Sequence, residues 1–170
     1  MIPSGVKIIA SYAFRNCKAA TSVTIPEGVK AIGEKAFFGC SSLEEIVLPD
    51  SLERIGGTFS EDEMKSGNID SKNNTEGGEV FASCTSLKTV IVGKNLEKVG
   101  VSVLDDCNAL ANVFYKGAVS DMDDVDIADG NDGIYAKLYF YSETEPEGEG
   151  LYWRYVSDVP TVWVIVGGGN

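Results

Sequence analysis

A spacing of 23 residues recurs along most of this sequence and constrains its fold more than any other feature. Pro3, Pro26 and Pro49 follow this spacing, and the four cysteines occupy one column of the period. Cys17 and Cys40 are 23 residues apart, Cys40 and Cys84 are 44 apart, and Cys84 and Cys107 are again 23 apart. Because 44 is 23 plus 21, an insert of 21 residues restores the period throughout.

Five apolar columns keep this period once the insert is removed. They are Phe14, Phe37, Phe81 and Leu104; Leu43, Leu87 and Leu110; Ile25, Leu48, Val92 and Tyr115; Val6, Val29, Leu52, Leu96 and Val119; and Ile9, Ile32, Ile55, Val99 and Met122. A unit of this size cannot bury its own apolar face, whereas stacked units bury a continuous core between neighbours. The sequence therefore predicts a solenoid.

Each predicted turn has three parts. The run from Leu43 to Leu48 alternates like a strand with one face inward, and Pro49 ends it because proline cannot donate to a strand ladder. The run from Leu52 to Ile55 forms a second short strand or corner, closed by Gly56. The segment Gly33–Cys40 is too short for a stable free helix, and we expect one or two helical turns there. The fold class is thus a β-rich α/β solenoid.

The four cysteines have two interpretations. Neighbouring strands lie about 4.8 Å apart, a spacing compatible in principle with disulfides between Cys17 and Cys40 and between Cys84 and Cys107. A free cysteine also packs as a small hydrophobic residue and is among the most buried residue types. We favour packed thiols, since columns stacked inward rarely orient their Cβ atoms for a disulfide.

The motif I-x-x-x-A-F-x-x-C-x-x-L-x-x-[IV]-x-[ILV]-P resembles the BspA-like leucine-rich repeat of bacterial surface proteins. The complete copy consists of Ile32, Ala36, Phe37, Cys40, Leu43, Ile46, Leu48 and Pro49. The resemblance covers residues 2–122, in four repeats and a partial fifth. Later copies depart from it, with Gly93 and Lys116 in place of proline and Val80 and Val103 in place of alanine. The resemblance implies a leucine-rich-repeat solenoid, a secreted or cell-surface location, and repeats that bind other macromolecules without shared catalytic residues.

We expect two domains, namely a solenoid over residues 1–142 and a C-terminal β-hairpin cap with a flexible tail over 143–170. Within the solenoid, the insert 57–79 is polar and predicts a mobile loop that projects from an edge or from the convex side. Asn73-Asn74-Thr75 in this insert fits a glycosylation sequon, but three-residue matches are common.

The acidic segment 121–133 also has two interpretations. We favour a solvated loop that leads into the last strand of the solenoid. Clustered carboxylates also suit calcium, although the EF-hand order fails because Ala128 stands at its third position. The calcium ligands would be Asp124, Asp126, Asp129, Asn131 and Asp132. The predicted metal content is nonetheless none, and no cofactor is expected.

The C-terminal residues predict three further strands. The run 136–143 alternates so that Leu138 and Phe140 point inward beneath Val113 and Tyr115. Residues 152–156 and 160–164 then form a hairpin joined near Ser157-Asp158. A solenoid end exposes apolar core that must be capped, and Trp153 and Trp163 are large enough to cover it. The alternative is a sugar-binding aromatic platform.

Residues between the inward positions of the main strands point outward and offer a candidate binding surface. One outward column is Thr24, Val47, Ile91, Phe114 and Tyr139, and the polar column beside it is Ser22, Glu45, Thr89, Asn112 and Lys137. An apolar stripe bordered by polar groups can bind a partner, although such pairs also stabilise a sheet by themselves. The candidate partner-binding residues are Val47, Ile91, Phe114, Tyr139, Glu45 and Asn112.

Composition narrows the function classes. The net charge is −12, which disfavours nucleic acid and anionic membranes as partners, and residues 105–150 hold 12 acidic and 2 basic side chains. No apolar run is long enough for membrane insertion and no signal peptide is visible. The chain has 0 histidines, which excludes Ser-His and Cys-His nucleophiles. We therefore expect a non-enzymatic module that binds a protein or glycan at the cell exterior, or alternatively a structural spacer.

Overall fold

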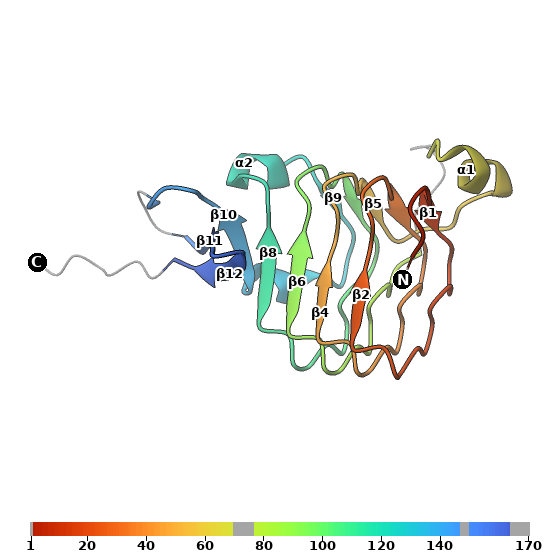
Figure 1. Cartoon of the computed structure of the whole chain (residues 1–170), viewed down its shortest axis with the longest axis horizontal. Coiled ribbons are helices and arrows are strands. Elements are labelled where there is room, and N and C mark those ends of the chain that lie inside the picture. Colours follow the sequence, from red (N-terminus) through yellow and green to blue (C-terminus); the bar gives the residue numbers. More distant parts are fainter. Residues whose placement is uncertain (1, 70–76, 147–149, 164–170) are drawn as a thin grey trace, which may run out of the picture.

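The computed structural model describes residues 2–69, 77–146 and 150–163, and it shows two sheets that run along a solenoid (Figure 1). The main sheet has the strand order β12-β11-β10-β8-β6-β4-β2, and the second sheet has the order β1-β3-β5-β7-β9. Neighbouring strands are parallel except β11 and β12, which are antiparallel. The solenoid predicted from the repeat is confirmed.

The strands are short, as the repeat requires. The main sheet contains β2 (Ser22–Thr24), β4 (Glu45–Val47), β6 (Thr89–Val92), β8 (Asn112–Tyr115), β10 (Leu138–Tyr141), β11 (Tyr152–Val156) and β12 (Val159–Val162). The second sheet contains β1 (Ile8–Ile9), β3 (Ala31–Ile32), β5 (Arg54–Ile55), β7 (Lys98–Val99) and β9 (Asp126–Ile127). The described helices are α1 (Glu61–Ser66), α2 (Val119–Met122) and α3 (Asp132–Tyr135).

One continuous hydrophobic core runs between the two sheets, built from the columns that the repeat defines. Phe37 and Leu43 are fully buried in the second repeat, as are Val80 and Leu87 in the third. The rings of Phe14 and Phe37 stack with centroids 5.1 Å apart, and those of Phe37 and Phe81 with centroids 5.4 Å apart. Each fully buried side chain of this kind stabilises the fold by about 1.5–3 kcal/mol relative to exposure.

The segment expected to form helical turns is instead a stack of tight turns, which we name the turn ladder (residues 12–16, 35–39, 79–83 and 102–106). Alternate amides bond to the next repeat, as the Phe37 N–H does to the Val80 carbonyl at 2.9 Å, and the amides between them bond three residues back, as the Ala36 N–H does to the Gly33 carbonyl at 3.2 Å. Residues with positive φ recur in it, at 52° for Lys35 and 51° for Glu79. Helical turns were the wrong prediction because hydrogen bonding between repeats satisfies these backbone groups.

The cysteines confirm packed thiols in three of four repeats. All four are free, and Cys40, Cys84 and Cys107 are buried. Each buried thiol donates to the phenylalanine carbonyl one repeat earlier: Cys40 to Phe14 at 3.2 Å, Cys84 to Phe37 at 3.2 Å, and Cys107 to Phe81 at 3.1 Å. Cys17 is exposed, contrary to expectation, because it stands in the first described turn and no earlier turn within the described residues covers it.

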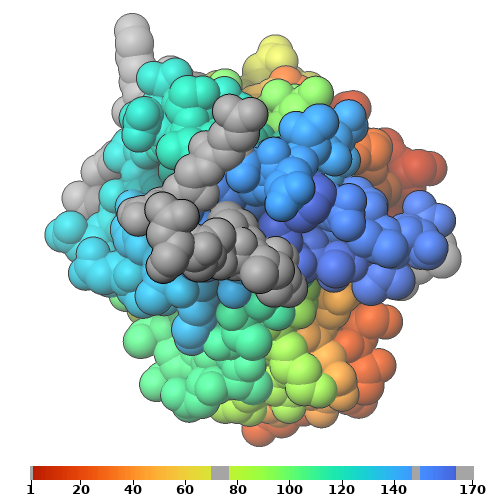
Figure 2. Space-filling model, turned by 90° about the vertical axis from the view of Figure 1, so that its left-hand side faces the viewer, coloured from red at the N-terminus to blue at the C-terminus, as the bar shows by residue number. Residues whose placement is uncertain are grey.

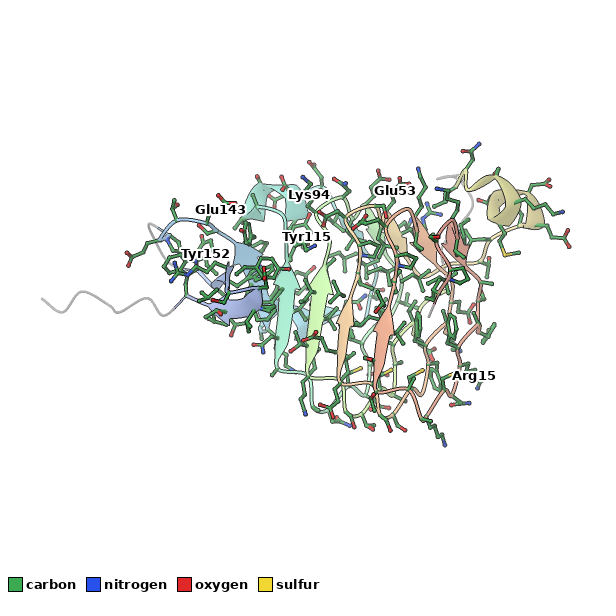
Figure 3. All side chains as sticks on the ribbon, viewed as in Figure 1. Arg15, Glu53, Lys94, Tyr115, Glu143 and Tyr152 are labelled. Carbon is green, nitrogen blue, oxygen red and sulfur yellow. The ribbon has the colours of Figure 1, made fainter. Side chains whose placement is uncertain are left out.

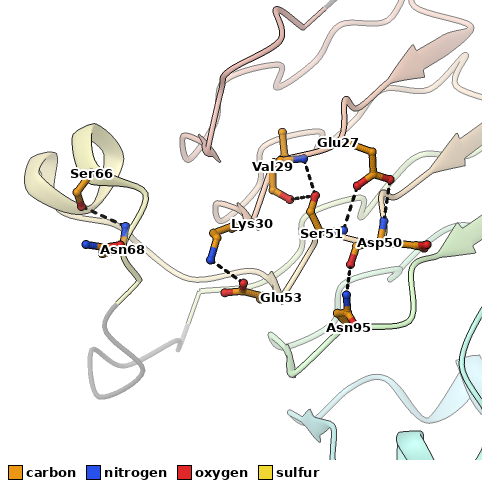
Figure 4. A network of polar contacts seen from close by, with 10 residues as sticks. Glu27, Val29, Lys30, Asp50, Ser51, Glu53, Ser66, Asn68 and Asn95 are labelled. Atoms are coloured by element: carbon orange, nitrogen blue, oxygen red, sulfur yellow. Dashed lines mark hydrogen bonds and ion pairs between the residues drawn. The ribbon is translucent and has the colours of Figure 1, made fainter.

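Polar contacts also join the corners that follow β2 and β4 (Figure 4). The Glu27 carboxylate accepts from the backbone N–H groups of Asp50 and Ser51 at 3.1 and 3.2 Å, and the Ser51 hydroxyl donates to the Val29 carbonyl at 2.9 Å. Lys30 forms an ion pair with Glu53 at 2.8 Å. These contacts join residues one repeat apart, so the corner fixes the register that the apolar columns set.

The insert is more ordered than the expected loop over its described residues. Helix α1 begins with a capping box in which the Glu63 N–H donates to the Ser60 hydroxyl at 3.3 Å and the Ser60 N–H donates to the Glu63 carboxylate at 2.8 Å. It ends at Gly67, whose φ is 72°. The helix projects from the edge near β1 (Figure 1). The proposed sequon Asn73-Asn74-Thr75 lies outside the described residues.

The acidic segment does not form the expected solvated loop, because its apolar residues cover the end of the core. Val125 is buried, and Met122, Ile127 and Ile134 pack against the core cluster. Strand β9 pairs Ile127 with Val99, so the period here is 28 residues rather than 23. Met122 and Val119 are therefore shifted out of the predicted columns, and Val119 is exposed. The additional residues form α2.

The C-terminal strands continue the main sheet. Leu138 pairs with Val113 and Phe140 with Tyr115, as expected. The hairpin of β11 and β12 turns at Ser157 and Asp158, with φ of 51° and 62°. Its second strand begins at Val159, one residue before the predicted start, and the predicted final residue Val164 lies outside the described part. The domain boundary at 142/143 stays a prediction, since the hairpin shares one sheet with the solenoid.

The buried thiols generate a stability prediction. In Cys40→Ser a hydroxyl replaces a thiol that is 1% exposed, and its shorter bond stretches the contact with the Phe14 carbonyl. Poor satisfaction of a buried hydroxyl costs ~1–3 kcal/mol, so we expect a loss of that size in the free energy of unfolding by urea. Cys17→Ser changes the same column at an exposed site and should cost less than about 0.5 kcal/mol. Equal urea midpoints for the two variants would show that Cys40 is not inside.

Candidate functional site

The outer face of the main sheet, in the foreground of Figure 1, carries the residues predicted to bind a partner. The register is as expected: Thr24, Val47, Ile91, Phe114 and Tyr139 are consecutive partners across β2, β4, β6, β8 and β10. Glu45 and Asn112 occupy the polar column, on either side of Thr89. The sheet thus brings the six predicted residues onto one face.

Exposure differs sharply along this face. Glu45 is exposed, Val47 is 39% exposed, and Asn112 and Tyr139 are half-buried. Ile91 and Phe114 are only 3% and 4% exposed. The expectation of a continuous exposed apolar stripe is therefore wrong at its centre.

Ile91 and Phe114 form one buried cluster with Trp153, against which Tyr139, Tyr141 and Val162 pack. The Trp153 side chain is fully buried on the outer face, and its ring lies 5.0 Å from that of Phe114 and 5.2 Å from that of Tyr141. Its indole N–H donates to the Tyr115 carbonyl at 2.9 Å, where β8 ends. Trp153 is thus an anchor that fixes the hairpin to the sheet face and not the expected cover of the solenoid end.

Trp163 lies on the opposite face of the sheet from Trp153. The neighbouring residues Val162 and Thr161 pair with Trp153 and Arg154, and the Trp163 N–H donates to the Tyr152 carbonyl at 2.9 Å. The indole N–H of Trp163 donates to the Ser142 carbonyl at 3.0 Å, and the Arg154 guanidinium lies 3.9 Å from its ring centroid. Figure 3 shows Tyr115 and Tyr152 at this end of the sheet. Trp153 therefore packs on the outer face of the sheet, and Trp163 packs on the opposite face.

Two further tyrosines extend the outer face beyond the predicted residues. Tyr141 is half-buried and Tyr155 is 41% exposed, and their rings lie 6.3 Å apart. Partial desolvation, followed by the nearby Glu143 carboxylate, raises the pKa of the Tyr141 hydroxyl, which stays protonated at neutral pH. The period of two along β10 places Tyr141 on the same face as Tyr139, so the sequence contained the signal for Tyr141.

The acidic segment does not assemble the alternative calcium site. Asn131 is buried, and its side chain accepts from the Val103 N–H at 3.0 Å and donates to the Gly100 and Ala128 carbonyls at 2.8 and 2.7 Å. Asp126 forms an ion pair with Lys98 at 2.9 Å. Within the described ranges no three His, Cys, Asp or Glu side chains are placed to hold one metal ion.

The buried thiols have no access to substrate. Burial raises the pKa of Cys107 to about 11. In the adjacent pair, contact with Cys40 and then burial raise the pKa of Cys84, whereas the hydrogen bond with Cys84 lowers that of Cys40 to about 7. Cys40 is 1% exposed, so an electrophile cannot reach it. These thiols pack the core.

Two hollows among the described residues are relevant to binding. One, of about 60 Å³, lies inside the core and is lined almost entirely by apolar side chains, including Val90, Val99 and Leu138. It is a packing void smaller than the ~150 Å³ apolar cavity known to bind benzene. The other, of about 320 Å³, is polar and open and lies beside the last turn of the turn ladder. None of the six predicted binding residues lines either hollow.

A comparison with protein families agrees with this architecture. A family model described as "BspA type Leucine rich repeat region" matches residues 1–124 in six copies. A crystal structure of a leucine-rich repeat protein from Bacteroides ovatus is 27% identical to this chain, with a TM-score of 0.43. That match covers 82% of this chain and 38% of the other, so this chain spans well under half of that protein's length. A comparison with curated proteins finds no match.

A matched pair of variants tests the burial pattern on the outer face. Val47 and Ile91 are neighbours in one column, but Val47 is 39% exposed and Ile91 only 3%. Ile91→Lys places an unpaired charge in the buried cluster of Ile91, Phe114 and Trp153 and should lower the free energy of unfolding by roughly 3 kcal/mol or more, whereas Val47→Lys should change it by less than about 0.5 kcal/mol. Urea unfolding followed by circular dichroism measures both. Similar losses in the free energy of unfolding for the two variants would contradict the assignment of Ile91 as buried and Val47 as exposed.

Proposed function

The chain belongs to the BspA-type leucine-rich repeat family, and on this premise we propose that it is a non-catalytic recognition module of a secreted or surface-attached bacterial protein. A repeat protein of this type is a protein-interaction or structural module. The finer proposal is that this module binds a protein or glycan at the cell exterior through the outer face of its main sheet. Nucleic acid is disfavoured by the net charge of −12.

One observation carries the proposal: the outer face combines exposed polar residues with partly exposed aromatic ones on a rigid sheet. Glu45 and Val47 are exposed at the β4 end, and Tyr155 is exposed at the β11 end. Half-buried tyrosines offer both ring surface and a hydroxyl, a combination typical of protein and sugar interfaces. We propose Glu45, Val47, Asn112 and Tyr139 as contact residues, with Ile91 and Phe114 as the buried support beneath.

Catalysis has little support from the same residues. The chain has 0 histidines, and three of its four cysteines are buried. Acidic side chains near the sheet are engaged in exposed ion pairs, such as Glu44 with Lys88 at 2.8 Å. No helix within the described residues is long and apolar enough to cross a membrane.

The second candidate is a structural spacer that holds another domain away from a surface. It is favoured by the arrangement of the main sheet, in which β2 and β12 lie at opposite edges. The two candidates differ in one respect. A spacer tolerates changes on the outer face, whereas a recognition module loses its partner.

A binding screen distinguishes them. The wild type would be applied to immobilised extracellular-matrix proteins, mucins and glycans, together with the variant Glu45→Lys/Val47→Lys/Tyr139→Ala. The control Lys94→Ala/Glu97→Ala changes two exposed residues away from the outer face. We expect a hit that weakens at least about tenfold in the triple variant, equivalent to 1.4 kcal/mol, and is unchanged in the control.

Circular dichroism must first show that all three proteins are folded. Binding that survives the triple variant would remove the outer face as the site. The absence of any hit for the wild type would favour the spacer.

A further inference from the structure

The turn ladder is regular through its first three turns. Every second N–H of a turn donates to a carbonyl of the next turn, so each turn makes three such bonds. The bonds join residues 12, 14 and 16 to 34, 36 and 38; residues 35, 37 and 39 to 78, 80 and 82; and residues 79, 81 and 83 to 101, 103 and 105. All nine are between 2.7 and 3.0 Å long.

The fourth turn keeps this conformation but completes only one of its three bonds. Ser102 and Asp106 have φ of 48° and 55°, close to 51° and 60° at the equivalent Glu79 and Ser83. The Ser102 N–H donates to the Asp129 carbonyl at 3.0 Å. Neither Leu104 nor Asp106, which occupy the two other donor positions, has a hydrogen-bond partner for its N–H among the described residues.

The chain leaves the ladder at this point for an identifiable reason. The Val103 N–H donates to the Asn131 side-chain oxygen at 3.0 Å, and α3 begins at the following residue. The backbone after Asp129 therefore turns away instead of supplying two further carbonyls. Figure 2 looks onto this end of the solenoid, where the blue strands of the C-terminal hairpin lie beside the green and teal last turns.

A hollow of about 320 Å³ occupies the place that a further turn would fill. One side of the hollow is formed by the end of the turn ladder and the residues after it, namely Leu104, Asp105, Asp106, Cys107, Asn108 and Leu110. The other side is formed by the segment around α3, namely Gly130, Asn131, Gly133, Ile134 and Lys137. The two unpaired donors thus belong to residues that line it. It is separate from the outer face of the main sheet.

We propose that this hollow binds a basic peptide segment of a protein partner, whose backbone carbonyls continue the turn ladder. The spacing of the donors selects this ligand. Leu104 and Asp106 are two residues apart, and in the earlier turns such donors bond to carbonyls that are also two residues apart. A peptide backbone supplies acceptors at that interval, as in recognition by strand addition.

Charge selects the side chains of the ligand. The lining contains the carboxylates of Asp105 and Asp106 against the single ammonium of Lys137. The described residues 104–146, which include the whole lining, have 10 acidic and 2 basic side chains. Lysine or arginine in the peptide is therefore attracted to this end of the molecule. A free carboxylate or phosphate is disfavoured, because the two donors match two separate carbonyls and the aspartates repel anions.

Gly133 provides a way to block the hollow without disturbing the fold. A Cβ added there has no heavy atom within 4 Å, and its backbone lies outside the positive-φ region. Gly133→Phe therefore places a ring in the hollow, and Gly133→Ala is the matched control. Asp105→Asn/Asp106→Asn removes the two carboxylates, and its control is Asp123→Asn/Asp124→Asn, which removes two exposed carboxylates away from the lining.

The test is an NMR titration of the folded full chain with acetyl-Ala-Lys-Ala-Arg-Ala-amide. The comparison peptide is acetyl-Ala-Glu-Ala-Glu-Ala-amide. We expect the basic peptide to shift the amide proton resonances of Leu104 and Asp106 downfield with a dissociation constant of about 1 mM or below, a range within reach of a short ligand. We expect Gly133→Phe and the Asp105→Asn/Asp106→Asn variant each to weaken binding at least about fivefold, with less than a twofold change in either control.

Three results would overturn the proposal. The first is unshifted Leu104 and Asp106 amides at saturating basic peptide. The second is an equal response to the acidic peptide or in Gly133→Phe. The third is a shift of these amides with protein concentration alone, which would make a second copy of the chain the occupant. All three are independent of the binding screen on the outer face.

Discussion

Hydrogen bonding between repeats is the interaction on which the rest of this structure depends. The strands are 2 to 5 residues long, too short to form a stable sheet or core within one repeat. Each turn instead satisfies its backbone groups and buries its apolar residues against the next. The same stacking explains the thiols, since each buried cysteine donates to the carbonyl of a phenylalanine in the preceding turn. Order in one repeat therefore requires order in its neighbours.

The C-terminal end shows how such a stack can be closed while part of it stays open. Residues of the acidic segment, including Val125 and Ile127, cover the core, and Trp153 fixes the hairpin to the outer face of the sheet. The turn ladder stays incomplete, because in its fourth turn the Ser102 N–H bonds to the Asp129 carbonyl whereas the N–H groups of Leu104 and Asp106 have no partner among the described residues. The end that carries most of the negative charge is thus also the end with unused donors, a combination suited to a basic peptide.

The period predicted the inward columns and the strand register because both depend on local repetition. Val47, Ile91, Phe114 and Tyr139 lie in the predicted register for this reason. The capping box of Ser60 and Glu63 was also readable in the sequence, although the insert was expected to be a mobile loop. The turn ladder replaced the expected helical turns because a neighbouring repeat supplies the acceptors, which a single segment does not reveal.

The candidate site was less predictable than the fold. The alternation of β10 and β11 assigns side chains to faces, but it does not show that Trp153 reaches across the sheet to Phe114. Ile91 and Phe114 are buried in the cluster that this contact helps to form. The open end of the ladder likewise depends on where the chain turns away, and the turn is set by the side chain of Asn131 rather than by the period.

Native-state hydrogen exchange tests the central claim most directly, namely that backbone bonds between repeats hold the solenoid and that those of the turn ladder are incomplete at its fourth turn. Phe37, Phe81 and Leu104 occupy equivalent donor positions, but only the first two have an acceptor among the described residues. The amides of Phe37 and Phe81 should exchange with free energies near that of global unfolding, and at least about a hundredfold more slowly than Leu104. Equal protection at the three positions would contradict this account.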